Sequence, residues 1–198
     1  MKKLLLISII TTLFVGCSGG GFAKKEKTAM KKADGLEFTA VQGYGLYGCV
    51  KSVTTDGHTI SFDEYGNVVS DGNSYIYQSP TQYMINNVIG PYRIICKDNI
   101  RREEDEQGIE MPIEYEFDER GRVIHRRYAE NMMPIEVKYT YDGWDKHPSS
   151  MTYRASYEDG EDKYTDQYTY LELDDQGNWT KRKVNRTWEV VTYNHVDN

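Results

Sequence analysis

Residues 113–128 read I-E-Y-E-F-D-E-R-G-R-V-I-H-R-R-Y and contain the pattern that the rest of the chain repeats. On the first arm of this stretch Ile113, Tyr115 and Phe117 alternate with two glutamates. An apolar residue at every second position is typical of a β-strand with one buried face. The stretch therefore predicts a hairpin whose arms each present one apolar face and one charged face.

A D-x-x-G sequence separates the two arms of this hairpin. An aspartate at the first position can accept hydrogen bonds from backbone N–H groups two residues on, and a glycine at the fourth can adopt positive φ. The same six-residue pattern occurs as FDEYGN at 62–67, FDERGR at 117–122 and LDDQGN at 173–178. The three aspartates are separated by 55 and 56 residues, which indicates a repeated structural unit. The turn residues are Asp63 and Gly66, Asp118 and Gly121, and Asp174 and Gly177.

The chain from residue 36 onward is predicted to be all-β. No stretch there has a 3.6-residue apolar period over 11 or more positions, and turn signals recur at short intervals. With 17 tyrosines against 5 phenylalanines, the composition suits half-buried strands. We expect about 10–13 strands in an antiparallel up-and-down meander of hairpins. A sheet of that length is expected to curl strongly, into a half-open or closed barrel.

The first residues predict export. Met1-Lys2-Lys3 is a charged start, and residues 4–15 form an apolar run that ends at Gly16-Cys17. A membrane-spanning helix needs about 20 apolar residues, so this run fits the core of a signal peptide better than a permanent anchor.

The sequence Phe14-Val15-Gly16-Cys17 resembles the lipobox of bacterial lipoproteins. The resemblance implies cleavage before Cys17, a lipid on its thiol and acylation of its amine. Ser18 is not the acidic residue linked with inner-membrane retention, so the resemblance implies the outer membrane. No acidic pair follows Cys17, which favours the periplasmic side over the cell surface. The alternative is an ordinary secretory signal followed by a chance cysteine. The organisation expected is a signal peptide at 1–16, a lipidated tether at 17–35 and one β-domain at 36–198.

The tether has its own composition. Residues 18–21 are serine and glycine only, and residues 22–33 contain five lysines among good helix formers. The second segment can be a short helix against anionic headgroups or a solvated spacer, and the spacer is favoured because acyl chains already supply membrane affinity.

The three aligned turns resemble the YD (RHS-like) repeat, whose core is Tyr/Phe-Asp-x-x-Gly-Asn/Arg between two strands. The resemblance covers roughly residues 46–193, and the last copy is similar to the final hairpin of YD-repeat lipoproteins from Gram-negative bacteria. It implies a β-sheet lipoprotein and no particular activity.

Two cysteines, Cys49 and Cys96, follow Cys17. In an oxidising compartment they can form a disulfide. Both lie in apolar, strand-like sequence, where buried free thiols are also common. The sequence leaves both alternatives open.

Few residues suggest catalysis. The four histidines are scattered without metal-ligand spacing, and no nucleophile motif or phosphate-binding glycine loop is present. We therefore expect no enzyme activity, metal or cofactor. The formal net charge of −7 argues against nucleic acid as a partner. Glu114 and Glu116 face Arg122, Arg126 and Arg127 across the hairpin, and we interpret them as exposed cross-strand ion pairs.

The three tryptophans, Trp144, Trp179 and Trp188, are the candidate ligand-binding residues. Together with tyrosines they can line a concave sheet face that stacks a sugar or a peptide, or they can fill a shallow core. The function expected is a non-enzymatic cell-envelope lipoprotein, held at the membrane by its lipid and acting as a structural or protein-interaction module. The alternative is a binder of a glycan, peptide or small ligand on that aromatic face.

Overall fold

The computed structural model describes residues 7–11, 13–16, 30–55, 57–86, 89–108, 110–130, 132–158 and 160–189. Within these ranges the chain forms two antiparallel sheets and one α-helix of four residues, α1 (Ala40–Gly43). In spatial order the large sheet consists of β1 (Ile7–Thr11), β15 (Trp179–Glu189), β14 (Gly160–Leu173), β13 (Ser150–Tyr157), β12 (Met133–Thr140), β11 (Val123–Glu130), β10 (Glu110–Phe117), β9 (Ile100–Glu104), β8 (Ile89–Lys97), β7 (Gln82–Ile85) and β6 (Tyr75–Ser79). The small sheet consists of β2 (Leu13–Gly16), β3 (Val50–Thr55), β4 (His58–Phe62) and β5 (Val68–Ser70).

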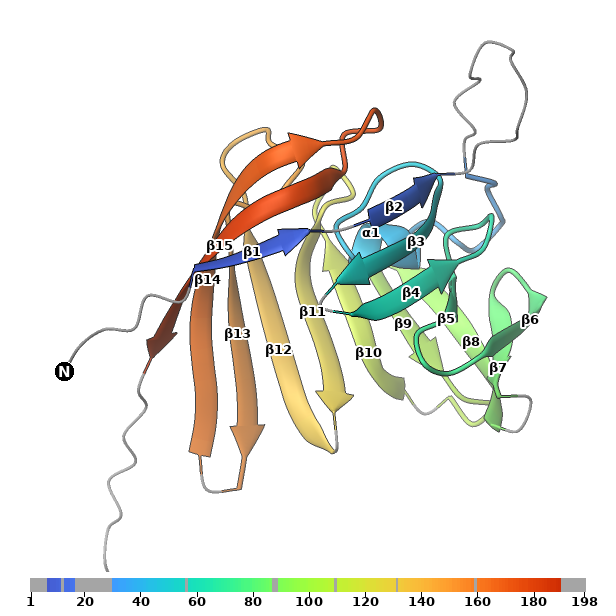
Figure 1. Ribbon diagram of the computed structural model, residues 1–198. Coiled ribbons are helices and arrows are strands. Elements are labelled where there is room, and N and C mark those ends of the chain that lie inside the picture. The colour runs from blue at the N-terminus through green and yellow to red at the C-terminus, as the bar shows by residue number, and fades with distance from the viewer. Residues whose placement is uncertain are drawn as a thin grey trace, which may run out of the picture.

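The predicted all-β antiparallel meander is confirmed. From β6 to β15 every strand pairs with the next one in the chain. The predicted barrel is not supported, because the large sheet is open and not strongly curled, with β1 and β6 as its two edges. The chain instead divides into two sheets between β5 and β6, and the small sheet lies in front of the middle of the large one (Figure 1). This packing buries apolar surface without closure.

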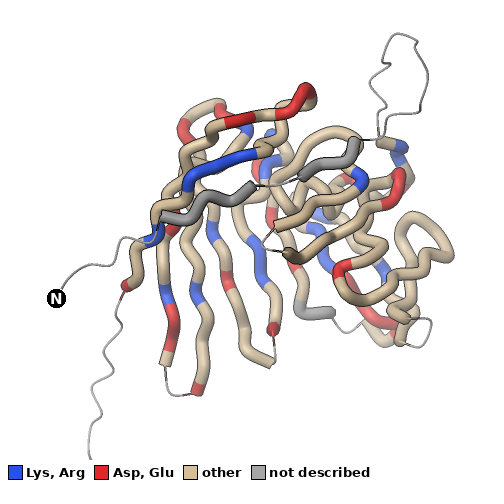
Figure 2. Tube along the Cα trace, in the orientation of Figure 1, with Lys and Arg blue, Asp and Glu red and all other residues tan. Residues whose placement is uncertain are grey.

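The large sheet has an aromatic face and a charged face, as the period-2 pattern requires. One cross-strand row on the aromatic face runs Arg101, Tyr115, Arg126, Val137, Tyr153, Tyr164 and Trp188. The next row, on the charged face, runs Arg102, Glu114, Arg127, Glu136, Arg154, Lys163 and Glu189. Acidic and basic positions on neighbouring strands are visible in Figure 2. Opposite charges placed in this way stabilise a sheet by about 0.2–1 kcal/mol per pair.

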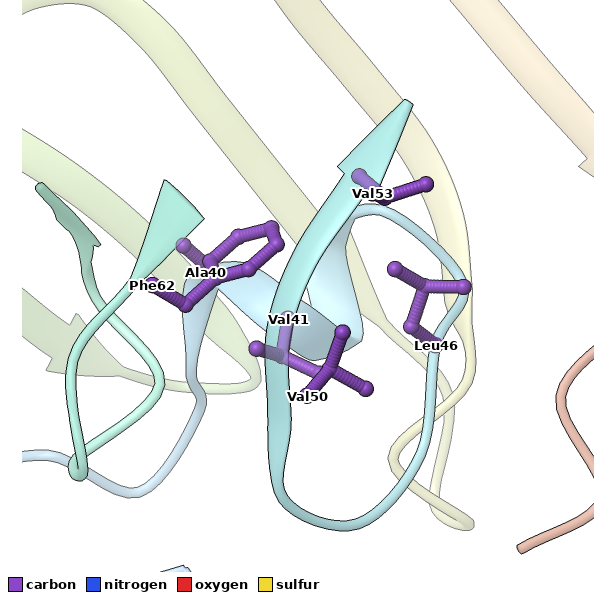
Figure 3. Close-up of a cluster of buried hydrophobic side chains, with 6 residues drawn as sticks. All are labelled: Ala40, Val41, Leu46, Val50, Val53 and Phe62. Atoms are coloured by element: carbon purple, nitrogen blue, oxygen red, sulfur yellow. The ribbon is translucent and has the colours of Figure 1, made fainter. Parts of the chain in front are cut away.

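Helix α1 packs against both sheets. Thr39 caps it, because the Thr39 hydroxyl accepts from Gln42 N (3.2 Å) while the Gln42 side chain accepts from Thr39 N (2.9 Å). A Cβ on Gly43 would come within 2.6 Å of the Tyr115 ring, so only glycine allows the helix to lie this close to β10. The helix and the small sheet share a buried cluster, drawn in Figure 3, of Ala40, Val41, Leu46, Val50, Val53 and Phe62.

All three D-x-x-G segments are hairpin turns with the same hydrogen bonds. In each turn the aspartate Oδ1 accepts from the backbone N–H groups two and four residues on, at 2.8–2.9 Å. The fourth-position glycines Gly66, Gly121 and Gly177 have φ of 77°, 71° and 84°. A non-glycine residue would be strained there.

The sixth residue of each six-residue pattern connects the hairpin to a neighbouring loop, a role that the local sequence does not predict. Asn178 is fully buried, donates to Tyr47 O (2.9 Å) and accepts from Tyr47 N (2.6 Å). Asn67 donates to Pro80 O (2.9 Å), and Arg122 donates to Asp145 O (2.7 Å). Each turn therefore forms a hydrogen bond to a loop outside its own hairpin.

The candidate disulfide between Cys49 and Cys96 is not formed. Cys96 on β8 has a free thiol, whose Sγ lies 3.7 Å from Phe38 O and donates a weak hydrogen bond there. Cys49 is buried next to β3 and takes no part in a bridge to Cys96.

The N-terminal predictions fall partly on the described residues. The apolar run supplies β1 at the edge of the large sheet and β2 at the edge of the small sheet. The lipid-attachment residue Cys17 and most of the predicted tether helix lie outside the described residues, and residues 30–33 have no regular structure. No helix in the described ranges is long and apolar enough to cross a bilayer.

We predict that Asn178→Ala lowers the free energy of unfolding by about 1–3 kcal/mol, because the two Tyr47 backbone groups lose their partner. Urea unfolding followed by circular dichroism measures this. The control is Asn73→Ala in an exposed turn, which should change the value by less than about 0.5 kcal/mol. Equal effects of the two substitutions would contradict the anchoring role of Asn178.

Candidate ligand cavity between the two sheets

A cavity of about 280 Å³ lies between the aromatic face of the large sheet and the small sheet. Strands β11 to β15 form one wall, and β3, β4 and the loop after α1 form the other. The walls are mostly apolar. The aliphatic and thioether side chains that line the cavity are Leu46, Val53, Ile60, Val123 and Met151, and the aromatic ones are Tyr44, Tyr139, Tyr168 and Trp179.

Two arginines line this apolar cavity. The Arg126 guanidinium, from β11, lies 4.4 Å from the Tyr128 ring centroid, 5.2 Å from that of Tyr44 and 5.5 Å from that of Tyr115. Arg182, from β15, lies 4.0 Å from Trp179 and 4.2 Å from Tyr168. These are cation–π contacts, which contribute about 0.5–2 kcal/mol each.

Neither arginine has an acidic partner among the described residues. No described carboxylate lies within ion-pair distance of Arg126 or Arg182, and none belongs to the described lining residues. The Nε atom of each is buried and has no hydrogen-bond partner in the described part of the chain. An unpaired charge in such surroundings costs several kcal/mol, and the ring contacts offset only part of it.

Tyr139 lines the cavity together with Arg126 and Arg182. Burial raises the pKa of Tyr139, and the charges of Arg126 and Arg182 both oppose that rise. Burial likewise raises the pKa of Tyr168, where the charge of Arg182 opposes the rise, and the pKa of Tyr44, where the charge of Arg126 opposes it. At neutral pH these phenols are therefore neutral, and their O–H groups can donate to a ligand.

The predicted placement of Arg126 was wrong. Arg127 pairs with Glu114 on the charged face, and Arg122 pairs with Asp118 (2.7 Å) inside the turn. Arg126 is opposite Tyr115 and lies on the aromatic face instead. The alternation of the strand predicts this placement of Arg126, since Arg126 and Arg127 are adjacent and must point to opposite faces.

The three tryptophans do not form one ligand-binding face. Trp179 is 6% exposed and lines the cavity, which places it in the core and next to the candidate site. Trp188 lies nine residues further along β15, roughly 30 Å away, and is 56% exposed. Trp144 is 82% exposed in the loop beside the second D-x-x-G turn, where the Arg120 guanidinium covers its ring at 3.3 Å.

The outer part of the aromatic face carries a second, smaller group of rings. Tyr153 and Tyr164 stack at 4.6 Å with planes 13° apart, and Trp188 lies 4.8 Å from Tyr164. Arg186 lies 3.8 Å above Tyr164 and forms a bidentate pair with Asp166 (2.7 and 2.8 Å). Unlike the cavity arginines, Arg186 is therefore neutralised.

The described histidines have separate surroundings. His125 lies between Glu116 and Glu136 on the charged face, while His147 lies near Tyr170 at the third turn. No group of three or more potential metal ligands occurs among the described residues, and His195 lies outside them.

No protein-family model matches the chain, and the searches of curated proteins and of solved structures find no match either.

His147 predicts a pH dependence of stability. Its Nε2 lies 2.6 Å from Gly177 O, while its Nδ1 is buried and has no partner among the described residues. Burial lowers the pKa of His147 below its usual 6.5, with the Gly177 carbonyl opposing this, so the unfolded chain binds the proton more readily than the folded one. The contribution of neutral His147 to the unfolding free energy is therefore complete above about pH 6.5. This contribution falls as the pH drops below that value.

Urea unfolding at pH 7.5, 6.5 and 5.5 measures this effect. We expect His147→Gln to lose less stability between pH 7.5 and 5.5 than the wild type, since glutamine does not take up the proton. The control His58→Gln, at an exposed position, should keep the wild-type slope. Identical slopes for His147→Gln and the wild type would contradict the prediction.

Proposed function

We propose that the chain is a lipid-anchored, non-enzymatic protein of the cell envelope that binds a small ligand between its two sheets. The single observation that carries the ligand-binding part is the cavity, which combines apolar and aromatic walls with a few polar groups. Sites for small molecules have this character and measure roughly 300–1,000 Å³, so this cavity suits a small ligand.

The proposed localisation rests on the N-terminal sequence. A charged start, a short apolar run and Gly16-Cys17 support cleavage and lipidation, with the outer membrane, on its periplasmic side, as the destination. Cleavage before Cys17 would remove β1 and β2, each of which is the edge strand of its sheet. The named cavity residues all follow α1, so they would remain in the processed protein.

A second candidate function is binding of a glycan or peptide on the outer part of the aromatic face. The observation that favours it is the stacked pair Tyr153 and Tyr164 beside the half-exposed Trp188. Aromatic rings open to water in this way can stack a sugar ring. Burial of Trp188 by a soluble oligosaccharide, seen as protection from acrylamide quenching, would support this candidate over the cavity.

For the lipid anchor, we predict that Cys17→Ser abolishes incorporation of a fatty-acid label and moves the protein from the membrane to the soluble fraction. Metabolic labelling and fractionation of expressing bacteria measure both. Cys96→Ser is the matched control and should leave both unchanged. A Cys17→Ser protein that keeps its label would overturn the proposed anchor.

For the cavity, we predict that the neutral dye N-phenyl-1-naphthylamine binds the protein with saturable, one-to-one stoichiometry and quenches Trp179. Ile60→Trp places a larger side chain in the cavity wall and should weaken dye binding at least about tenfold, or about 1.4 kcal/mol. Ile76→Trp, at an exposed site on β6, is the control. Equal dye affinity in both variants would place the dye elsewhere.

A further inference from the structure

We propose that the cavity binds an anionic ligand with an apolar body, and that Arg126 and Arg182 hold its negatively charged head. This inference rests on the proposed ligand-binding function and specifies its chemistry. The ligand class is a small monoanionic amphiphile, with a carboxylate or phosphate head on an alkyl or aromatic body.

Other arginines near Arg126 and Arg182 have acidic partners. Arg101 is almost fully buried on the aromatic face and pairs with Glu103 at 3.0 Å. Arg186, on the same strand as Arg182, has a bidentate pair with Asp166. The chain has 31 acidic residues against 24 basic ones, so acidic partners are plentiful. Their absence around Arg126 and Arg182, among the described residues, leaves two positive charges in one apolar cavity.

Aromatic rings hold both guanidinium groups in place. The Arg126 guanidinium lies 4.4 Å from the Tyr128 ring centroid, and the Arg182 guanidinium lies 4.0 Å from that of Trp179. Hydrogen-bond donors lie at the edge of a guanidinium, and the buried Nε of each group is a donor without an acceptor in the described part of the chain. The terminal N–H groups of a guanidinium can donate to a carboxylate or phosphate through charge-assisted hydrogen bonds, which are about twice as strong as neutral ones.

The rest of the ligand would lie against apolar walls. Leu46, Val53, Ile60 and Met151 offer no hydrogen-bonding groups, so the part of the ligand beyond its head must be apolar. Tyr139 lies within the influence of both arginines and remains neutral, so its hydroxyl can donate to the same anion. A cation finds no carboxylate among the described lining residues.

The experiment uses three ligands that differ only in the head: decanoate, decanol and decylammonium, each below its micellar concentration. The protein is the full chain carrying Cys17→Ser, which the lipidation prediction expects to be free of lipid. Displacement of N-phenyl-1-naphthylamine gives the affinities. We expect decanoate to bind at least about tenfold more tightly than decanol, and decylammonium not to displace the dye.

Two variants localise the effect. Arg126→Gln and Arg182→Gln should each weaken decanoate binding about tenfold or more while leaving decanol binding within about twofold. Arg120→Gln is the matched control, because Arg120 also covers a tryptophan but lies outside the cavity. If either glutamine variant fails to fold, the charge-retaining Arg126→Lys or Arg182→Lys replaces it, and the comparison of the three heads on the unsubstituted cavity stands by itself.

Each contrary outcome has a distinct meaning. Equal affinity for decanoate and decanol, or tighter binding of decylammonium, would overturn the anionic ligand while leaving the ligand cavity in place. Dye that binds but is not displaced by free decanoate would also overturn it, since the cavity would then not accept the free anion. Failure of the dye itself to bind would instead refute the proposed function on which the inference rests.

Discussion

The structure depends on one constraint: an eleven-stranded sheet with an aromatic face has to cover that face without closing into a barrel. The small sheet and α1 provide the cover over the middle of the large sheet (Figure 1). Because the core consists of several small clusters, the interface between the sheets is not filled throughout. The cavity occupies the space that remains between β3–β4 and β11–β15, and its position follows from the way the two layers meet.

The D-x-x-G turns contribute to this arrangement through hydrogen bonds to segments outside their hairpins. Asn178 ties the last hairpin to Tyr47, in the loop that enters the small sheet, and Gly66 O of the first turn accepts from Val41 N of α1 (3.1 Å). The repeated turn therefore fixes the relative position of the two sheets as well as closing hairpins. A ligand cavity between layers needs such fixed walls, because a preformed site binds without an ordering cost.

Much of the fold could be predicted from local sequence. Alternation on both sides of Asp118 and Asp174 gave antiparallel hairpins, and the three aspartates do accept the expected backbone hydrogen bonds. The division into two sheets could not be predicted. Hairpin signals are local, and they do not show that β5 and β6 belong to different sheets. The same limit explains why the sequence left the disulfide between Cys49 and Cys96 open. Cys96 lies on β8 of the large sheet, whereas Cys49 directly precedes β3 of the small sheet.

The candidate site was only partly accessible to sequence reasoning. Of the three tryptophans selected from the sequence, Trp179 lines the cavity, whereas Trp144 and Trp188 lie elsewhere, because spacing along the chain does not fix position across a sheet. Arg126 was assigned to the charged face by grouping it with Arg127, although strict alternation separates the two. Arg182 gave no signal, since its partners Tyr168 and Trp179 come together only when β14 and β15 pair.

The most direct measurement of the central claim is the pKa of decanoate, labelled with ¹³C at its carboxyl carbon, when bound to the protein. Burial in an apolar cavity alone raises the pKa of a carboxylate, whereas two adjacent guanidinium groups lower it. A bound carboxyl resonance that titrates below that of free decanoate, and loses this shift in Arg126→Gln and Arg182→Gln, is the result expected. A bound pKa above the free value would mean that the cavity accepts the alkyl chain but that Arg126 and Arg182 do not hold the anion.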